Sequence, residues 1–465
     1  MFTITEIAQA TEGKLIHGED RLSVSSVSID SRQVAKGELF VAVKGDIFDG
    51  HDFIADVVAR GVRVLVVHKP IKISDPKVSV IMVKNTTLAL GDLARFHRLR
   101  FKIPVIALTG SAGKTTTKEM IAVVLSKKYR VLKNEGTQNN HIGVPLTLLK
   151  LKPTHQVVVL ECGTNQPGDI PWLADVARPD VAVFTNIGES HLEKLKTPKG
   201  VLKEKWTLTN WMKKQGTVII NTDDAFLGPQ AKTCKNVRVI SYGMKNLCRI
   251  QAKNVRVEMG HHLVFSINGN QQGGSSTRET TFELNTCGIN NMYNALAAYA
   301  CGDLLAVPVK DMIVALKNFE FPKGRGQILK LGKGWLINDS YNANPVSMRS
   351  AIQTLKELES LGKKILVVAD MLELGTKTKE LHAQVGRVIA QSGIDVLITV
   401  GALSRHLAAQ ARAHNKNMKV FACADIDSAQ KNLAKILANG DAVLVKGSRR
   451  MAMERVVEFL LKSPG

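Results

Sequence analysis

A buried-strand pattern, a glycine-containing turn and a helical stretch follow one another between residues 103 and 117. The strand pattern covers Ile103–Leu108, and the turn covers Thr109–Gly113. In such a turn successive backbone N–H groups can face a phosphate, and the helix that follows adds partial positive charge at its N-terminus. Lys114 is placed to reach the β- and γ-phosphates of a nucleotide, and Thr115 to ligate Mg²⁺. An ordinary strand-to-helix turn with a surface lysine is the alternative, because Leu108 stands where the full phosphate-loop pattern has glycine.

The rest of the chain alternates predicted strands with predicted helices, which indicates an α/β fold. A length of 465 residues favours about three domains. We predict a small N-terminal α/β domain in residues 1–85 and a central P-loop ATPase-type domain in residues 86–320. The central domain should hold a mostly parallel sheet and a β-hairpin region with a turn at 268–274. Residues 321–465 are predicted to form a Rossmann-like, doubly wound domain.

Composition narrows the classes of function. The net charge of +22 favours anionic partners, but the basic residues are spread along the chain and aromatic residues make up 5%. Stacking platforms for single-stranded nucleic acid are therefore sparse, and no nucleic-acid partner is expected. The six cysteines form no Cys-x-x-Cys pair. The sequence shows no basic leader and no long apolar run, so we expect a cytoplasmic protein without stable membrane insertion.

Two further residues, Glu161 and His191, are candidates for the chemistry. Glu161 ends a predicted strand, where open α/β sheets bind ligands, and its carboxylate suits Mg²⁺. His191 follows the predicted strand Val181–Phe184 and should lie on the same rim, although a histidine in that place is more often structural. Lys205 lies in a Lys-Glu-Lys run that by itself predicts a solvated helix face.

Several segments, in order along essentially the whole chain, resemble the Mur ligase family. The turn at Thr109–Thr117 has that family's short glycine form. Further matching segments are Asn139–Leu149, Glu161–Gly163, Asn186–Lys205, Asn291–Ala295, Gly324–Arg325 and Asp339–Pro345. The segments that resemble the D-alanyl-D-alanine-adding members are Asp30–Arg32, Gly37–Ala42, Gly45–Phe53, Asp370–Gly375 and Lys446–Arg449.

The resemblance implies an ATP-dependent ligase that joins D-alanyl-D-alanine to the terminal carboxylate of a UDP-N-acetylmuramoyl-tripeptide through an acyl phosphate, as a monomer. It implies that residues 1–85 bind the UDP-linked substrate, residues 86–320 bind ATP and residues 321–465 bind the incoming dipeptide. It implies catalytic roles for Lys114, His191 and Lys205, with Lys205 N-carbamoylated. Two Mg²⁺ ions would be held by Thr115, Glu161, His191 and Lys205. Lys205 can take part because its carbamate offers anionic oxygens, whereas a lysine cation would repel the metal. The residues implied to bind ATP are Gly110, Ser111, Ala112, Gly113, Lys114, Thr115, Thr116, Asn291, Asn294, Arg325 and Asp339.

The residues implied to bind the other substrates are Asp30, Ser31, Arg32, Asn139, Asn140, Tyr341, Asn344, Lys446, Ser448 and Arg449. Two positions depart from the family pattern. Asn290 stands where a histidine is usual, and His141 stands where an acidic residue is usual. The alternatives are a ligase of this family that adds the third residue, a folylpolyglutamate-synthetase-like ligase and, more remotely, a nucleic-acid-stimulated P-loop ATPase.

Overall fold

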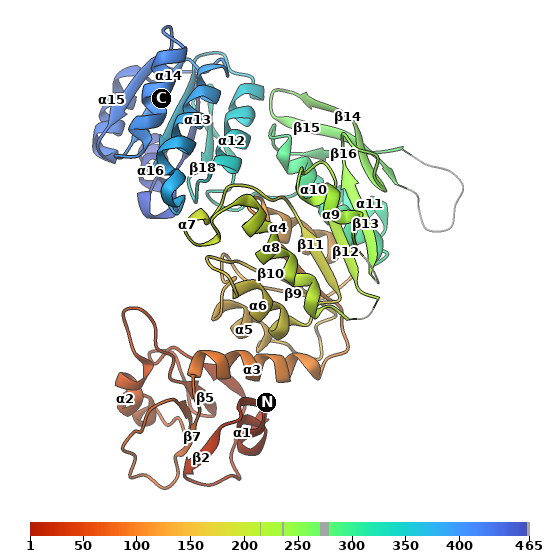
Figure 1. Cartoon of the computed structure of the whole chain (residues 1–465), viewed down its shortest axis with the longest axis vertical. Helices are drawn as coiled ribbons and strands as arrows, with labels where there is room; N and C mark the ends of the chain where they lie inside the picture. The colour runs from red at the N-terminus through yellow and green to blue at the C-terminus, as the bar shows by residue number, and fades with distance from the viewer. Residues whose placement is uncertain (214, 235–236, 270–278, 463–465) are drawn as a thin grey trace.

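The computed structural model describes residues 1–213, 215–234, 237–269 and 279–462. Within them the strands form sheets of two, five, nine and six strands. Figure 1 shows three units along the long axis, with the N-terminal unit at the bottom, the C-terminal unit at the top and the nine-stranded sheet between them. The predicted α/β fold class, with parallel strands in each large sheet, is confirmed.

The N-terminal unit starts with a capped helix. Thr3 Oγ1 accepts from Glu6 N at 3.2 Å, and Glu6 Oε2 accepts from Thr3 N at 2.9 Å, at the start of helix α1 (Ile4–Thr11). The five-stranded sheet runs in the order β2 (Lys14–His17), β7 (Ser79–Met82), β6 (Val64–Val67), β5 (Glu38–Val41) and β4 (Ser26–Ser28). Strands β4 to β7 pair in parallel, and β2 pairs antiparallel with β7. Strands β2 and β4, and the separate pair β1 (Phe2–Thr3) and β3 (Ser23–Val24), were not predicted.

Helix α3 (Thr86–Leu99) joins this unit to the central one. It packs on α1 and also on α5 (Gly143–Leu148) and α6 (Asp169–Ala177) of the central unit. Arg98 on α3 is buried, and its guanidinium donates to the carbonyl oxygen of Ala177 and lies 3.4 Å from an Asp180 oxygen. The connection is therefore a packed helix.

The central sheet follows the order β16 (Glu279–Leu284), β15 (His262–Gly269), β14 (Ile250–Glu258), β13 (Arg238–Gly243), β12 (Thr217–Asn221), β11 (Val181–Phe184), β8 (Val105–Thr109), β10 (Val157–Glu161) and β9 (Val131–Lys133). The strands from β14 to β9 pair in parallel, and β14, β15 and β16 pair antiparallel. Every residue of β8 is buried, as expected for a strand covered on both faces. On one face the helices α4 (Lys114–Leu125) and α10 (Asn290–Leu304) pack together.

The predicted hairpin region is present, but its predicted turn is partly wrong. Residues 268 and 269 belong to β15, because that strand continues its ladder with β14 and β16 to this point. The rest of the predicted turn, 270–274, lies outside the described residues. The turn between β14 and β15 falls at residues 259–261.

The six-stranded sheet follows the order β17 (Gln327–Leu331), β18 (Gly334–Asp339), β22 (Ala442–Lys446), β19 (Lys364–Ala369), β20 (Val396–Val400) and β21 (Lys419–Cys423). Alternate residues of β19 face opposite cores. One face is covered by α12 (Pro345–Glu357), α13 (Thr378–Ala390) and α14 (Ser404–His414), and the other by α15 (Ile426–Ile436) and α16 (Glu454–Lys462). This is the predicted doubly wound arrangement. The antiparallel hairpin of β17 and β18 was not predicted.

Among the helices of the described residues, none combines the length and apolar character needed to cross a lipid bilayer.

Candidate active site

A cleft of about 1280 Å³ lies between the units, and all three contribute to its lining. Most of the predicted site residues meet there. These are Ser111, Ala112, Gly113, Lys114, Thr115, Thr116, Asn139, Asn140, Glu161, His191, Asn291, Asn294, Arg325, Asp339, Tyr341, Asn344, Lys446, Ser448 and Arg449. Its size exceeds the range of about 300–1,000 Å³ for one drug-sized ligand, which suits a site for several substrates.

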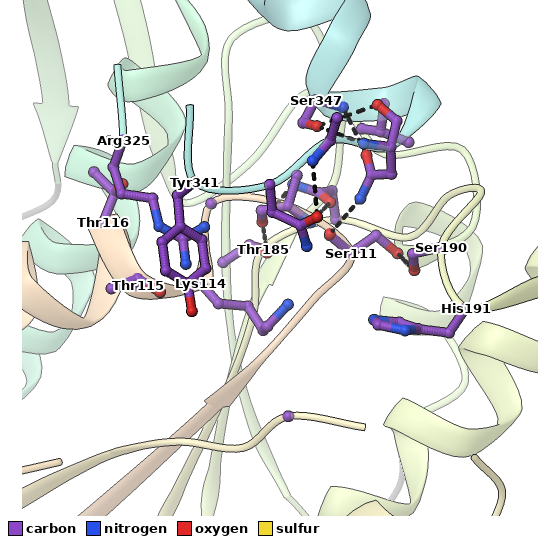
Figure 2. A pocket seen from close by; sticks show the side chains of 18 of the residues that line it. Ser111, Lys114, Thr115, Thr116, Thr185, Ser190, His191, Arg325, Tyr341 and Ser347 are labelled. Atoms are coloured by element: carbon purple, nitrogen blue, oxygen red, sulfur yellow. Dashed lines mark hydrogen bonds between the residues drawn. The ribbon is translucent and has the colours of Figure 1, made fainter. Parts of the chain in front are cut away.

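The predicted phosphate loop connects the central strand β8 to helix α4. Gly113 closes the loop at a φ of 78°, and a Cβ added there would lie 2.6 Å from Asn294 Oδ1. Glycine is therefore required for both backbone conformation and space. Lys114 Nζ donates to the carbonyl oxygen of Gly110 at 2.9 Å. Burial lowers the pKa of the Lys114 ammonium, and the charge of Glu161 opposes that shift. In Figure 2 the Lys114 side chain extends beneath the loop toward His191. This arrangement can receive a phosphate.

Glu161 is the last residue of β10, and its carboxylate faces the start of α4. Thr115 Oγ1 donates to Glu161 Oε2 at 2.9 Å, and Asn139 Nδ2 donates to Oε1 at 2.7 Å. The side chain of Asn134 holds the Glu161 backbone, with Oδ1 accepting from N at 2.9 Å and Nδ2 donating to O at 3.0 Å. A hydroxyl and a carboxylate oxygen side by side are the donors that Mg²⁺ prefers.

Lys205 does not lie on a solvated helix face, which corrects the reading of its local sequence. It is fully buried on α8 (Pro198–Trp206), and its Nζ is among the described buried atoms without a hydrogen-bond partner. The preceding residue, Glu204, accepts from the backbone N–H groups of Gly168 at 3.0 Å and Ile170 at 2.8 Å, which fixes α8 against the start of α6. Burial, and next the charge of Lys114, hold the pKa of Lys205 well below its usual value. This amine is therefore uncharged far more readily than a surface lysine.

His191 reaches the cleft from the segment after β11, the position predicted for it. Its φ is 51°, and its Nδ1 lies 2.7 Å from an oxygen of Glu373 in the last unit. Burial lowers the pKa of the His191 imidazole, while the hydrogen bond to Glu373 acts in the opposite direction.

The two asparagines predicted to contact the nucleotide also attach α10 to α4. Thr117 Oγ1 donates to Asn294 Oδ1 at 3.0 Å, and Asn294 Nδ2 donates to Asn291 Oδ1 at 3.0 Å. Asn290, which differs from the residue usual in the family, donates from Nδ2 to Ser350 Oγ on α12 at 2.7 Å. It thereby joins the central and C-terminal units.

His141, the other residue that differs from the family pattern, lines the cleft and packs against Trp172, with ring centroids 4.4 Å apart. Its Nε2 lies 3.8 Å from Asp169 Oδ1. The acidic side chain that the family pattern has at this position is thus replaced by a group that can pair with a neighbouring carboxylate.

The C-terminal unit brings charged and aromatic groups to the opposite wall. Lys446 Nζ donates to Asp339 Oδ2 at 2.6 Å, so two residues predicted to bind different substrates contact each other. The Arg325 guanidinium lies 3.8 Å from the centre of the Tyr341 ring. Asn344 Nδ2 donates to the carbonyl oxygen of Ser111 at 3.1 Å, which places the start of α12 directly on the phosphate loop (Figure 2).

Some predicted residues lie elsewhere. Gly110 and Lys205 are next to the cleft but not in its lining. Asp30, Ser31 and Arg32 are in the N-terminal unit and also outside the lining, and Asp30 pairs with Arg32 at 2.9 Å. That unit contributes Asp46 to the cleft.

Sequence reasoning assigned no role to several residues that shape the site. These are Asp46, Asn134, Asn186, Glu204 and Glu373. Asn186 holds Ala112 of the phosphate loop through both of its amide atoms, at 2.9 and 3.1 Å. Asp46, Asn186, Glu204 and Glu373 fall inside segments that resemble the family, which was the available signal. Asn134 had no such signal.

Gly188 offers a test of how closely the last two units approach. A Cβ on Gly188 would lie 2.2 Å from Cγ2 of Val346 on α12. We expect Gly188→Ala to disfavour this approach by about 1–3 kcal/mol, the usual cost of overpacking, and so to lower turnover by about five- to 150-fold. Steady-state kinetics would measure the loss. The double variant Gly188→Ala/Val346→Ala removes the clashing methyl and should recover most of the rate; equal loss in both variants would show that the clash is not the cause.

Comparisons with known proteins agree with this architecture. The family model for the Mur ligase family, catalytic domain, matches residues 23–98. The Mur ligase middle domain matches residues 108–302, and the Mur ligase, glutamate ligase domain, matches residues 324–449.

Individual relatives match over almost the whole chain. The UDP-N-acetylmuramoyl-tripeptide–D-alanyl-D-alanine ligase of Bacillus subtilis is 35% identical over 99% of both chains. The ligase of the same name from Escherichia coli is 35% identical over 98% of both chains. Among solved structures, a MurF from Acinetobacter baumannii superposes with a TM-score of 0.90 at 31% identity over 99% of both chains. A MurF ligase from Thermotoga maritima in complex with ADP has a TM-score of 0.83 at 28% identity, over 94% of this chain and 97% of the other.

Proposed function

The chain belongs to the Mur ligase family, and from that membership we propose that it joins D-alanyl-D-alanine to UDP-N-acetylmuramoyl-tripeptide at the expense of ATP. It is an ATP-dependent carbon–nitrogen ligase of peptidoglycan precursor synthesis. The observation that carries this assignment is the cleft, where the half-buried Lys114 and a Thr115–Glu161 pair face charged groups of the last unit.

The proposed reaction has two covalent stages. First, a carboxylate oxygen of the tripeptide attacks the γ-phosphorus of ATP, the bond from that phosphorus to the bridging oxygen breaks, and an acyl phosphate and ADP form. Second, the amine nitrogen of D-alanyl-D-alanine attacks the acyl carbon. The tetrahedral intermediate loses a proton from nitrogen and expels phosphate, which leaves the amide.

The chain's own groups fit the demands of the first stage. Transfer of a phosphoryl group needs positive charge and N–H donors around its oxygens and little covalent assistance. The N-terminus of α4 supplies oriented N–H groups, and Lys114 supplies a positive charge. The Lys114 ammonium donates to the carbonyl oxygen of Gly110, which is neutral and leaves the charge of the ammonium uncompensated. Arg325 adds a second positive charge, a half-buried guanidinium from the last unit, so ATP would lie between the central and C-terminal units.

The donor set suits magnesium. Mg²⁺ prefers oxygen ligands and usually takes one or two from protein, with water and phosphate for the rest. Among the described residues no group of three or more His, Cys, Asp or Glu side chains is arranged to hold a metal, which is compatible with such sparse protein ligation. We propose that Thr115 and Glu161 hold one ion, and that His191 and a carbamate on Lys205 help to hold a second. The ions would neutralise charge on the phosphates.

Lys205 fits this role because its amine is buried and unpartnered. A neutral amine nitrogen attacks carbon dioxide, loses a proton and becomes an anionic carbamate. That group would place a negative charge near the Lys114 ammonium, where a Lys205 cation would be repelled.

The second stage needs the dipeptide held and water excluded. We propose that Lys446, Ser448 and Arg449 receive the dipeptide carboxylate, with Tyr341 and Asn344 beside them. Asn139 and Asn140 would contact the tripeptide end of the acceptor, and Asp30, Ser31 and Arg32 its uridine end. Contact of the last unit with the phosphate loop would shield the acyl phosphate from hydrolysis. We also propose a monomeric enzyme that acts in the cytoplasm.

Turnover of the purified protein tests the assignment. With ATP, Mg²⁺, UDP-N-acetylmuramoyl-tripeptide and D-alanyl-D-alanine present, we expect phosphate release coupled one-to-one to formation of the pentapeptide product. Omitting any one of the four components should reduce product formation to background. Release of phosphate with DNA or RNA in place of the two peptide substrates would contradict the proposal.

A further inference from the structure

The contact between His191 and Glu373 joins two units through residues 182 positions apart, at 2.7 Å. Both residues have left-handed backbones, with φ values of 51° and 63°. A residue other than glycine in this conformation costs about 1–3 kcal/mol, and such strain persists where the surrounding structure enforces it, often at functional sites. Two strained residues therefore face each other across the boundary between units.

Glu373 is held firmly by its own unit. The backbone N–H of Met371 donates to His382 Nε2 at 3.0 Å. The backbone N–H of Leu372 donates to Ser448 Oγ at 2.9 Å. Because two consecutive residues before Glu373 are tied to the C-terminal unit, the backbone that carries the Glu373 carboxylate moves with that unit.

The segment Glu373–Gly375 also contacts the segment that carries His191. Glu193 N donates to the carbonyl oxygen of Glu373 at 3.2 Å. At Gly375, where φ is 60°, an added Cβ would lie 3.0 Å from Glu193 Cα. The backbones meet closely enough that the position of Glu373 relative to His191 is set by main-chain contact as well as by the side-chain hydrogen bond.

The hydrogen bond fixes the imidazole. A carboxylate accepts, so His191 Nδ1 carries the proton, and the lone pair of a neutral ring is then at Nε2. Histidines that ligate metals commonly donate their other ring N–H to a carboxylate, which fixes ring orientation and tautomer. His191 also lines the cleft.

We propose that Glu373 is a positioning residue of the ligase reaction: it holds His191 with Nδ1 protonated and Nε2 available to a ligand in the cleft, and only when the C-terminal unit lies against the central one. The inference rests on the function proposed above for His191. It makes assembly of the site depend on the seating of the last unit, because the carboxylate comes from that unit.

An Arg–Glu ion pair between the same units provides a matched control. Arg349 on α12 lies 2.7 Å from Glu189, two residues before His191, and neither side chain lines the cleft. Partly exposed ion pairs of this kind contribute about 0–1 kcal/mol. If Glu373 were merely another such pair, removing either contact should have the same small effect.

The first experiment reads the tautomer without substrates or metal. Protein labelled with ¹⁵N at histidine is compared as wild type, Glu373→Ala, Glu373→Gln and Arg349→Ala, with the His191 signals assigned through His191→Gln. We expect the Nδ1–H tautomer in the wild type, in Glu373→Gln, whose amide oxygen still accepts, and in Arg349→Ala. In Glu373→Ala the Nε2–H tautomer should appear. An unchanged His191 spectrum in Glu373→Ala would overturn the proposal.

The second experiment reads kinetics in the intact enzyme. Loss of a partner of this kind typically costs about 10- to 100-fold in metal affinity or activity. We expect Glu373→Ala to raise the Mg²⁺ concentration for half-maximal rate and to lower kcat within that range, with KM for ATP changed much less. Glu373→Gln should recover part of the loss, and Arg349→Ala should match the wild type. Equal behaviour of Glu373→Ala and Arg349→Ala would overturn the inference.

Different results would contradict the proposed ligase function and the proposed role of Glu373. A wild-type protein with no ligase turnover would contradict the proposed function, and the tautomer measurement could still show what Glu373 does to His191. An active wild type whose Glu373→Ala variant keeps both its tautomer and its Mg²⁺ dependence would contradict only the inference about Glu373.

Discussion

Lys114→Ala is expected to abolish ligase turnover while leaving the protein folded. The Lys114 ammonium is desolvated at the start of α4, and its hydrogen bond is to a neutral carbonyl rather than to a carboxylate. Removing one preorganised charge or donor from such a site typically costs about 10²–10³-fold in kcat, and Lys114 would act on the group that carries the most developing charge. We therefore expect a loss at or beyond the upper end of that range, measured as ADP formation.

Stability should respond in the opposite sense to activity. A buried charge without a fully compensating partner destabilises a fold, so its removal should leave the melting temperature unchanged or raise it. Lys127→Ala is the matched control, because Lys127 is an exposed lysine just after the same helix. It should retain the wild-type rate and stability. A Lys114→Ala protein that melts normally and turns over at the wild-type rate would remove the phosphate loop from the mechanism.

Lys205→Ala is expected to lose activity that small carboxylates partly restore. The variant removes the group that we propose to become an anionic carbamate, so the expected loss is about 10²–10³-fold, as for other preorganised electrostatic contacts. Truncation to alanine leaves a cavity at a fully buried position. Formate, acetate or bicarbonate could enter this cavity and return the missing negative charge. Rates measured across a titration of each anion would show the recovery.

The exposed Lys203 on the same helix supplies the control. Lys203→Ala should keep the wild-type rate and show no response to added carboxylate. In the wild type, exchange with ¹³C-labelled bicarbonate should produce a carbamate resonance that Lys205→Ala lacks and Lys203→Ala retains. A wild-type enzyme that is fully active in carbon-dioxide-free buffer, with no such resonance, would show that Lys205 acts as an unmodified amine.

The parts of the structure that depend on neighbouring residues in the sequence were predictable. The strand at Val105–Thr109 and the helix that begins at Lys114 follow from a continuous apolar run and a glycine turn. The capping box of Thr3 and Glu6 needs only a spacing of three residues. Short strands such as Ser26–Ser28 were missed because three residues are too few to show a periodicity.

The parts that depend on distant contacts were not predictable from local pattern. Lys205 looks like a surface residue because its burial comes from the packing of α8 on α6, which Glu204 secures through backbone groups 34 and 36 residues away. The pairing of Glu373 with His191 has no local signature at all. For the site residues, resemblance to a family placed them in one region, and the structure shows most of them lining one cleft.

Helix α3 has a consequence for selection among acceptors. Since it packs on both the first and the central unit, and its Arg98 is buried between Ala177 and Asp180, the first unit is held at a set distance from the phosphate loop. With the uridine end anchored in that unit, as we propose, the fixed distance selects acceptors by the length of their peptide. An acceptor peptide one residue shorter or longer would place its terminal carboxylate about 3.5 Å out of line with the γ-phosphate. The enzyme would therefore discriminate between acceptors by peptide length, independently of contacts to their side chains.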